Sequence, residues 1–154
     1  MKVWVSGHGM YKTEYHVVFC TKYRRRILNP GLEGYLRKLF LKVIRQMPGV
    51  VINTIGFDTK LKDHVHLEMV IPPKYAISEV IGQIKGWTGS QMRKKFPWLE
   101  KVYWKENIIW SEGFFVSSVG VNEEMIKHYI LWQGKQDSGQ VQLNLKDSAN
   151  LKTK

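Results

Sequence analysis

The sequence has little cysteine and no long apolar segment. Its single cysteine, Cys20, excludes an internal disulfide and any multi-cysteine zinc site. Cys20 lies among apolar residues, which indicates a small core residue rather than a nucleophile. No apolar run approaches the roughly 20 residues that span a bilayer, and the first residues lack the apolar segment of a signal peptide. We therefore expect a cytoplasmic protein.

Acidic residues are also scarce. Lys and Arg total 24 against 13 Asp and Glu, which gives a formal net charge of +11. This excess favours a polyanionic partner, because each cation placed on a phosphate releases a counterion. The 154 residues contain no internal repeat and suit one domain with a single core. We expect that domain over 1–134, with a loose leader at 1–12 and a polar tail at 135–154 that contains at most one short strand, over 140–145.

Hydrophobic spacing predicts four strands and three helices. The strands are expected over 14–21, 50–57, 63–71 and 113–119. The helices are expected over 32–47, 78–96 and 122–134, the second capped by Ser78 and the third ended by Gly134. The first six elements follow the order strand, helix, strand, strand, helix, strand, which is the signature of a ferredoxin-like α+β fold. Such a fold has an antiparallel sheet with two helices on one face, and we expect the other face to be open, with the third helix as a C-terminal addition.

The strand over 63–71 carries two histidines. His64 and His66 are two residues apart, so both project from the face opposite the apolar Val65 and Leu67. That placement puts them on the uncovered face of the sheet. Two imidazoles at this spacing can bind one metal ion, whereas without a third ligand they could equally be ordinary histidines of a half-exposed strand.

The C-terminal helix carries a tyrosine and a glutamine four residues apart. Tyr129 and Gln133 therefore lie on one face of that helix. Taken alone, they could simply be surface residues of a terminal helix.

Basic and aromatic residues gather in three places. One is the run after the first strand, where a phosphate-contact loop and a solvated loop are about equally expected. The second is Lys85 in the second helix, either a DNA-phosphate contact or a solvated lysine. The third is the segment 98–110, whose aromatics are typical of either a base-stacking surface or an aromatic core. The candidate DNA-binding residues are Lys22, Arg24, Arg25, Arg26 and Lys85.

The ordered set of motifs resembles the single-tyrosine HUH transposases (TnpA) of the smallest bacterial and archaeal insertion sequences. HUH denotes His, hydrophobic residue, His, which is matched by His64-Val65-His66 with Asp63 before it. The tyrosine of that family, followed four residues later by a polar metal ligand, is matched by Tyr129 and Gln133. Further similar stretches, within a resemblance that runs from about Tyr11 to Gln133, are Tyr15–Phe19, the basic run 22–26, Ile84-Lys85-Gly86 and Trp110–Val116.

The resemblance implies a specific activity. Such enzymes cleave and rejoin single-stranded DNA at the ends of a mobile element and recognise DNA hairpins near those ends. Tyr129 would attack the scissile phosphate to form a 5′-phosphotyrosine, and His64, His66 and Gln133 would hold a divalent metal. Two neutral nitrogens and an amide oxygen leave coordination positions open for DNA and water, which fits Mg²⁺ or Mn²⁺. The resemblance also implies a homodimer in which the tyrosine helix can complete the partner's site.

Three alternatives remain open at this stage. A domesticated relative would process repeated genomic palindromes by the same chemistry. A non-catalytic single-stranded nucleic-acid-binding module would use the charge and the aromatics but would leave the histidines, Tyr129 and Gln133 unexplained. A metal-dependent phosphodiesterase with water as its nucleophile would stay active after Tyr129→Phe.

Overall fold

A four-stranded antiparallel sheet organises the computed structural model, which describes residues 3–104, 106–118 and 122–139. In space its strands follow the order β4-β5-β3-β6. Every neighbouring pair is antiparallel, and this order is that of a ferredoxin-like sheet, in which the first and third strands of the motif are central. The α+β prediction is therefore confirmed. The strands are β3 (Glu14–Cys20), β4 (Val51–Phe57), β5 (His64–Val70) and β6 (Phe115–Ser117).

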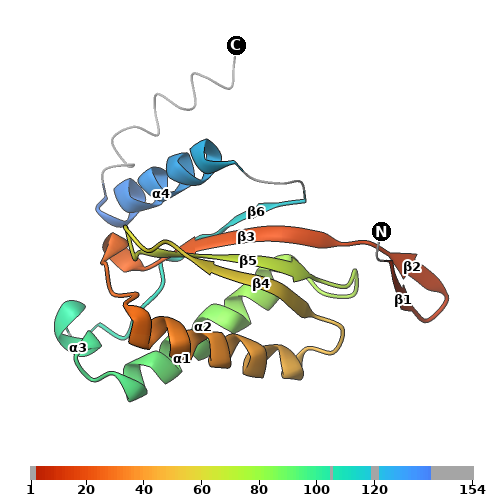
Figure 1. Ribbon diagram of the computed structural model, residues 1–154, viewed down its shortest axis with the longest axis horizontal. Coiled ribbons are helices and arrows are strands. Elements are labelled where there is room, and N and C mark those ends of the chain that lie inside the picture. Colours follow the sequence, from red (N-terminus) through yellow and green to blue (C-terminus); the bar gives the residue numbers. More distant parts are fainter. Residues whose placement is uncertain (1–2, 105, 119–121, 140–154) are drawn as a thin grey trace, which may run out of the picture.

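Two helices, α1 (Pro30–Val43) and α2 (Ile77–Lys95), cover one face of this sheet (Figure 1). α1 begins where the Asn29 side chain accepts a hydrogen bond from the backbone N–H of Leu32, and Pro30 suits the first helical position. The apolar sides of both helices meet the apolar face of the sheet, where burial of side chains stabilises the fold. The core between them includes Phe19, Leu36, Phe40, Val65, Leu67 and Ile84.

A third long helix, α4 (Glu123–Asp137), lies over the opposite face of the sheet (Figure 1). Tyr129 and Ile130 of α4 pack there on Val18 and Cys20 of β3 in a second, smaller apolar cluster. The expectation that this face is open is therefore wrong. The face that carries the two histidines is partly covered, because β3 presents apolar side chains on it that α4 buries.

Several boundaries differ from the predictions. α2 begins at Ile77 after Ala76, which makes no side-chain cap, so Ser78 lies inside the first turn instead of capping it. The expected loose leader contains an antiparallel hairpin of β1 (Trp4–Ser6) and β2 (Gly9–Tyr11). The shorter elements are two 3-10 turns, η1 (Lys22–Arg24) and η2 (Ile44–Gln46), and the helix α3 (Leu99–Val102).

The aromatic segment 98–110 divides between core and surface. Tyr103 and Trp110 are buried, and Trp110 packs edge to face on Phe19 of the central strand. Trp104, by contrast, is 84% exposed. Tyr103 and Trp110 thus belong to the core, whereas Trp98 and Trp104 are exposed and remain as candidates for base stacking.

None of the helices in the described ranges is long and apolar enough to cross a membrane. The strand expected over 140–145, with the rest of the polar tail beyond residue 139, lies outside the described residues.

Candidate active site

β5 places both histidines on the face that α4 covers. In the register of the sheet, His64 pairs with Cys20 and His66 pairs with Val18. The two imidazole rings lie with their centroids 4.9 Å apart. His64 is buried, whereas His66 is half-buried. The predicted pairing of the two histidines on one face is thus what the backbone produces.

Asp63 fixes the orientation of His64. Its Oδ1 lies 2.8 Å from His64 Nδ1, and its Oδ2 accepts a hydrogen bond from Arg24 Nε at 3.1 Å. A carboxylate paired with a guanidinium is ionised and only accepts hydrogen bonds, so Nδ1 of His64 carries the proton. The other ring nitrogen, Nε2, is therefore the one available to a metal. A carboxylate behind a histidine is the arrangement that orients metal-binding imidazoles.

The histidines border a cavity of about 600 Å³ between the sheet and α4. Burial, together with the neighbouring His64, lowers the pKa of His66 to about 4. His66 is therefore neutral at pH 7, and its lone pair is free for a metal. The rest of the lining comprises Asp58–Leu61 and, on α4, Glu123, Ile126, Lys127 and Ile130.

Two imidazoles that line one cavity fit a divalent metal ion. No cluster of three or more His, Cys, Asp or Glu side chains able to hold a metal occurs in the described part of the chain. A side-chain amide oxygen is a further type of protein ligand for such an ion.

The α4 helix carries the tyrosine and the glutamine side by side. α4 begins where the Asn122 side chain accepts a hydrogen bond from the N–H of Met125, as predicted. The Tyr129 hydroxyl donates to Gln133 Oε1 at 3.4 Å, and the two residues are only 8% and 2% exposed. Burial raises the pKa of Tyr129 above its ordinary value near 10, so the phenol keeps its proton in this arrangement.

The structure thus yields two pairs on one face of the sheet. Tyr129 packs against Cys20, and Cys20 is the cross-strand neighbour of His64. No hydrogen bond within the described ranges joins the tyrosine and glutamine pair directly to the histidine pair. Burial raises the pKa of the Cys20 thiol to about 12, so Cys20 is a packing residue here, as expected, and not a nucleophile.

The helix does not end at Gly134 but continues to Asp137. Gly134 serves close packing instead, because a Cβ at this position would lie 2.5 Å from Cδ of Arg24. Arg24 in turn pairs with Asp63, so the C-terminal part of α4 rests on the residues that orient His64.

Asp137 is a site residue that the sequence prediction missed, since it was assigned to the tail. Its Oδ1 accepts a hydrogen bond from Gln133 Nε2 at 3.1 Å. Tyr129, Gln133 and Asp137 follow one another at intervals of four, so they form one polar line along α4. That continued spacing was the signal that could have identified Asp137.

The candidate DNA-binding residues fall into two groups. Lys22 lies 3.4 Å from Asp137, and Arg24 is paired with Asp63, so both serve internal contacts. Arg25 and Arg26 are exposed. The DNA contacts of all these residues stay a prediction, and the exposed pair suits it best.

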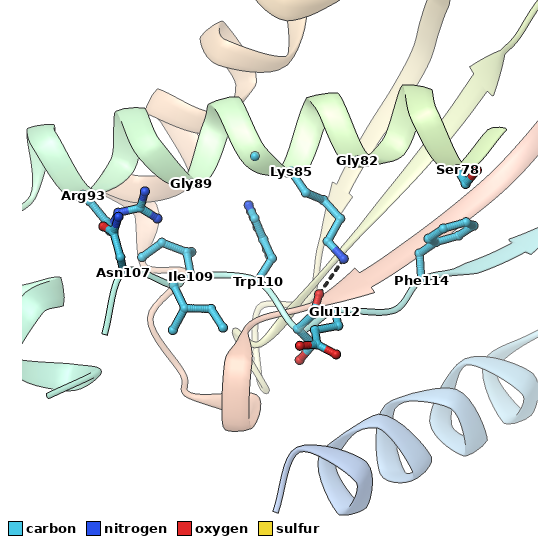
Figure 2. Close-up of a pocket in the computed structure, with 13 residues that line it drawn as sticks. Ser78, Gly82, Lys85, Gly89, Arg93, Asn107, Ile109, Trp110, Glu112 and Phe114 are labelled. Carbon is cyan, nitrogen blue, oxygen red and sulfur yellow. Dashed lines mark hydrogen bonds between the residues drawn. The ribbon is translucent and has the colours of Figure 1, made fainter. Parts of the chain in front are cut away.

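Lys85 holds the segment before β6. From α2 it donates hydrogen bonds to the carbonyl oxygens of Ser111 and Gly113, the latter at 2.7 Å. Figure 2 shows the Lys85 side chain extending from α2 towards this segment. A second cavity, of about 490 Å³, lies between α2 and the segment 107–114. Burial lowers the pKa of Lys85 to about 8. A structural role therefore accounts for Lys85, and its contact with DNA stays a prediction.

Comparison with known proteins agrees with this architecture. The family described as "Transposase IS200 like" matches residues 9–133. The transposase of insertion sequence IS200 from Salmonella typhimurium is 29% identical over 139 residues, which cover 90% of this chain and 88% of that protein. The ISDra2 transposase TnpA of Deinococcus radiodurans is 30% identical over 97 residues, 62% of this chain and 66% of that one.

A solved structure agrees as well. A crystal structure of a Deinococcus radiodurans protein described as a transposase superposes with a TM-score of 0.72 at 26% identity. The superposition covers 86% of this chain and 98% of the other. The family match extends over most of the sequence and includes both histidines, Tyr129 and Gln133. The chain therefore belongs to the IS200-like transposases.

Proposed function

We propose that this transposase cleaves and rejoins single-stranded DNA at the ends of a mobile element through a covalent 5′-phosphotyrosine on Tyr129. DNA hairpins near those ends are the elements it recognises. The observation that carries the proposal is the placement of Tyr129 and Gln133 on the same sheet face as His64 and His66. Membership of the IS200-like transposases supports DNA as the substrate.

His64, His66 and Gln133 are the residues that would hold the metal, Mg²⁺ or Mn²⁺. The free Nε2 of His64, the neutral imidazole of His66 and the amide oxygen of Gln133 supply uncharged ligands. When bound, the divalent ion polarises the phosphate oxygens and stabilises the leaving 3′-oxygen.

Tyr129 supplies the nucleophile. Its oxygen forms a bond to the phosphorus while the bond from phosphorus to the 3′-oxygen breaks, and the phenolic proton leaves Tyr129 as the 3′-oxygen gains one. Rejoining reverses both changes, so the energy of the phosphodiester is retained. Because burial raises the pKa of Tyr129, we expect attack only once substrate and metal have changed the surroundings of the hydroxyl.

The test is a denaturing gel that detects a covalent adduct between the protein and a labelled single-stranded oligonucleotide from the flanks of the gene. We expect an adduct with Mg²⁺ or Mn²⁺, none with chelator, and none in Tyr129→Phe, His64→Ala or His66→Ala. Cleavage that persists in Tyr129→Phe would indicate water as the nucleophile. Tight binding without any cleavage would indicate a binding module. Oligonucleotides from repeated genomic palindromes distinguish a domesticated relative, because they would then be the preferred substrates.

We also propose that the protein acts as a homodimer. Mixing two inactive variants, Tyr129→Phe and His64→Ala, tests where the nucleophile acts. If α4 completes the site of the partner, the mixed dimer contains one intact site and adduct formation returns. If α4 acts within its own chain, both sites of the mixed dimer remain defective.

A further inference from the structure

Asp137 accepts hydrogen bonds from three separate parts of the chain. Gln133 Nε2 and Lys22 Nζ lie 3.1 and 3.4 Å from Oδ1. The backbone N–H of Tyr23, at 2.9 Å, and the Ser111 hydroxyl donate to Oδ2. The carboxylate is 2% exposed and is thus saturated with donors in a nearly dry place. A buried carboxylate with this many charge-assisted hydrogen bonds is held rigidly in one position.

The Asp137 carboxylate determines the orientation of the Gln133 side-chain amide. The oxygen and the nitrogen of an amide have nearly the same shape, so packing alone does not distinguish them. An ionised carboxylate accepts hydrogen bonds only, and the amide must therefore present Nε2 to Asp137. Its Oε1 then points the other way, towards the Tyr129 hydroxyl.

The oxygen end of the Gln133 amide is also constrained. A Cβ on Gly113 would lie 2.6 Å from Gln133 Oε1, so the backbone of Gly113 closes that side. Lys85 holds the carbonyl of Gly113, and Ser111 two residues earlier bonds Asp137. The segment 111–113 therefore limits Gln133 from one side while Asp137 bonds it from the other.

We propose that Asp137 is a positioning residue for the transposition reaction: it fixes the side-chain amide of Gln133 with Oε1 towards Tyr129 and the metal site. This inference rests on the proposed role of Gln133 as a metal ligand. Asp137 itself does not contact the metal or the DNA; it acts through Gln133. Lys22 and the N–H of Tyr23 keep Asp137 in place.

The decisive experiment exchanges the carboxylate of Asp137 and the amide of Gln133 between the two positions. Asp137→Asn can present an amide to the amide of Gln133, so that Gln133 turns over and directs Nε2 into the site. Gln133→Glu alone places two carboxylates together. In the double variant, Asp137→Asn with Gln133→Glu, the amide and the carboxylate change places, and the net charge equals that of the wild type. An acceptor oxygen then faces the site again, now from a carboxylate instead of an amide.

The first readout is the affinity for Mn²⁺ alone, measured by electron paramagnetic resonance. We expect Asp137→Asn to weaken Mn²⁺ binding by about 10- to 100-fold, as is typical when a residue that orients a ligand is lost. The exchanged pair should bind within a few-fold of the wild type. Gln136→Ala, at the exposed neighbouring position, is the matched control and should bind as the wild type does.

The second readout needs no metal. The side-chain amide resonances of Gln133 report its hydrogen bond to Asp137 in the metal-free protein, and they should move to the position of a free amide in Asp137→Ala. If they stay in place and Asp137→Asn keeps full Mn²⁺ affinity, the proposal is overturned. It is also overturned if the exchanged pair binds Mn²⁺ no better than Asp137→Asn, or if that pair does not fold. If Gln133→Ala binds Mn²⁺ normally while the resonances move as expected, the ligand role of Gln133 fails, whereas its orientation by Asp137 stands.

Discussion

At the scale of single residues, Gly113 shows how the backbone shapes the site. The position needs a glycine for space and not for an unusual backbone angle, because Gly113 is absent from the residues with positive φ. An added Cβ would lie 2.6 Å from Gln133 Oε1, closer than a real Cβ contact allows. The backbone of Gly113 therefore approaches the amide oxygen more closely than a residue with a side chain could.

Gly113→Ala should displace the Gln133 amide and reduce the rate of adduct formation by tenfold or more, with the fold retained. Gly34→Ala in α1 is the matched control, because a Cβ there meets nothing within 4 Å. Replacing an exposed helical glycine by alanine should stabilise the control by about 0.5–1 kcal/mol. The measurements are the rate of adduct formation and the melting temperature of each of the two variants. Equal adduct rates in the two variants would contradict the proposed close contact.

At the scale of elements, α4 is held by two kinds of contact. In its middle, Tyr129 and Ile130 pack on the apolar side chains of β3. At its C-terminal end, Gly134 rests on Arg24 and Asp137 bonds to η1. The outer side of the helix is exposed and includes Leu131 and Trp132. The position of α4 thus depends on polar contacts as well as on burial.

Gly134→Ala tests this seating of α4. A Cβ at 2.5 Å from Arg24 Cδ must push Arg24 away from Asp63 or lift the helix, and such overpacking typically costs about 1–3 kcal/mol of unfolding free energy. In an Arg24→Ala background the obstacle is gone, so the same substitution should be neutral or stabilising, because alanine favours helix. Chemical denaturation of the wild type, the two single variants and the double variant gives the coupling free energy between the two substitutions. Additive effects would mean that Gly134 and Arg24 do not compete for space.

At the scale of the whole molecule, the chain forms three layers, and the main core and the candidate site lie on opposite faces of the middle layer, the sheet. The layer of α1 and α2 and the central sheet enclose the main core, while α4 and the other sheet face enclose the candidate site (Figure 1). The chain as a whole carries a formal net charge of +11. Position, and not the total charge, therefore determines which cations contact DNA.

Replacing Arg25 and Arg26 together by alanine should weaken binding of single-stranded DNA and make it less dependent on salt. If each arginine contacts one phosphate, the slope of log K against log salt concentration should fall by about 1.4. The control is Lys38→Ala with Lys42→Ala, which removes the same charge from exposed positions of α1. Fluorescence anisotropy over a salt series gives both slopes. An equal fall in both variants would indicate diffuse attraction without a defined contact at Arg25 and Arg26.

Much of the fold was predictable because its signals are local. Alternation along 63–71 defines β5 and places His64 and His66 on one face, and helical spacing places Tyr129 beside Gln133. The order of strands and helices was sufficient for the ferredoxin-like sheet, because that order is the signature of the fold. Spacing along the chain therefore paired the motif residues, and the resemblance to the transposase family supplied their expected roles.

Tertiary structure alone decided how these parts meet. Nothing in the local pattern of 122–139 states that α4 covers the histidine face, that Gly134 packs on Arg24, or that Asp137 bonds to Tyr23. Those contacts join residues more than 100 positions apart, such as Tyr23 with Asp137. Local spacing determines which face of an element a side chain occupies, whereas the partner on that face follows from packing. The sequence by itself thus determined the elements and the candidate ligands, and the packing of α4 on the sheet decided how those ligands are oriented.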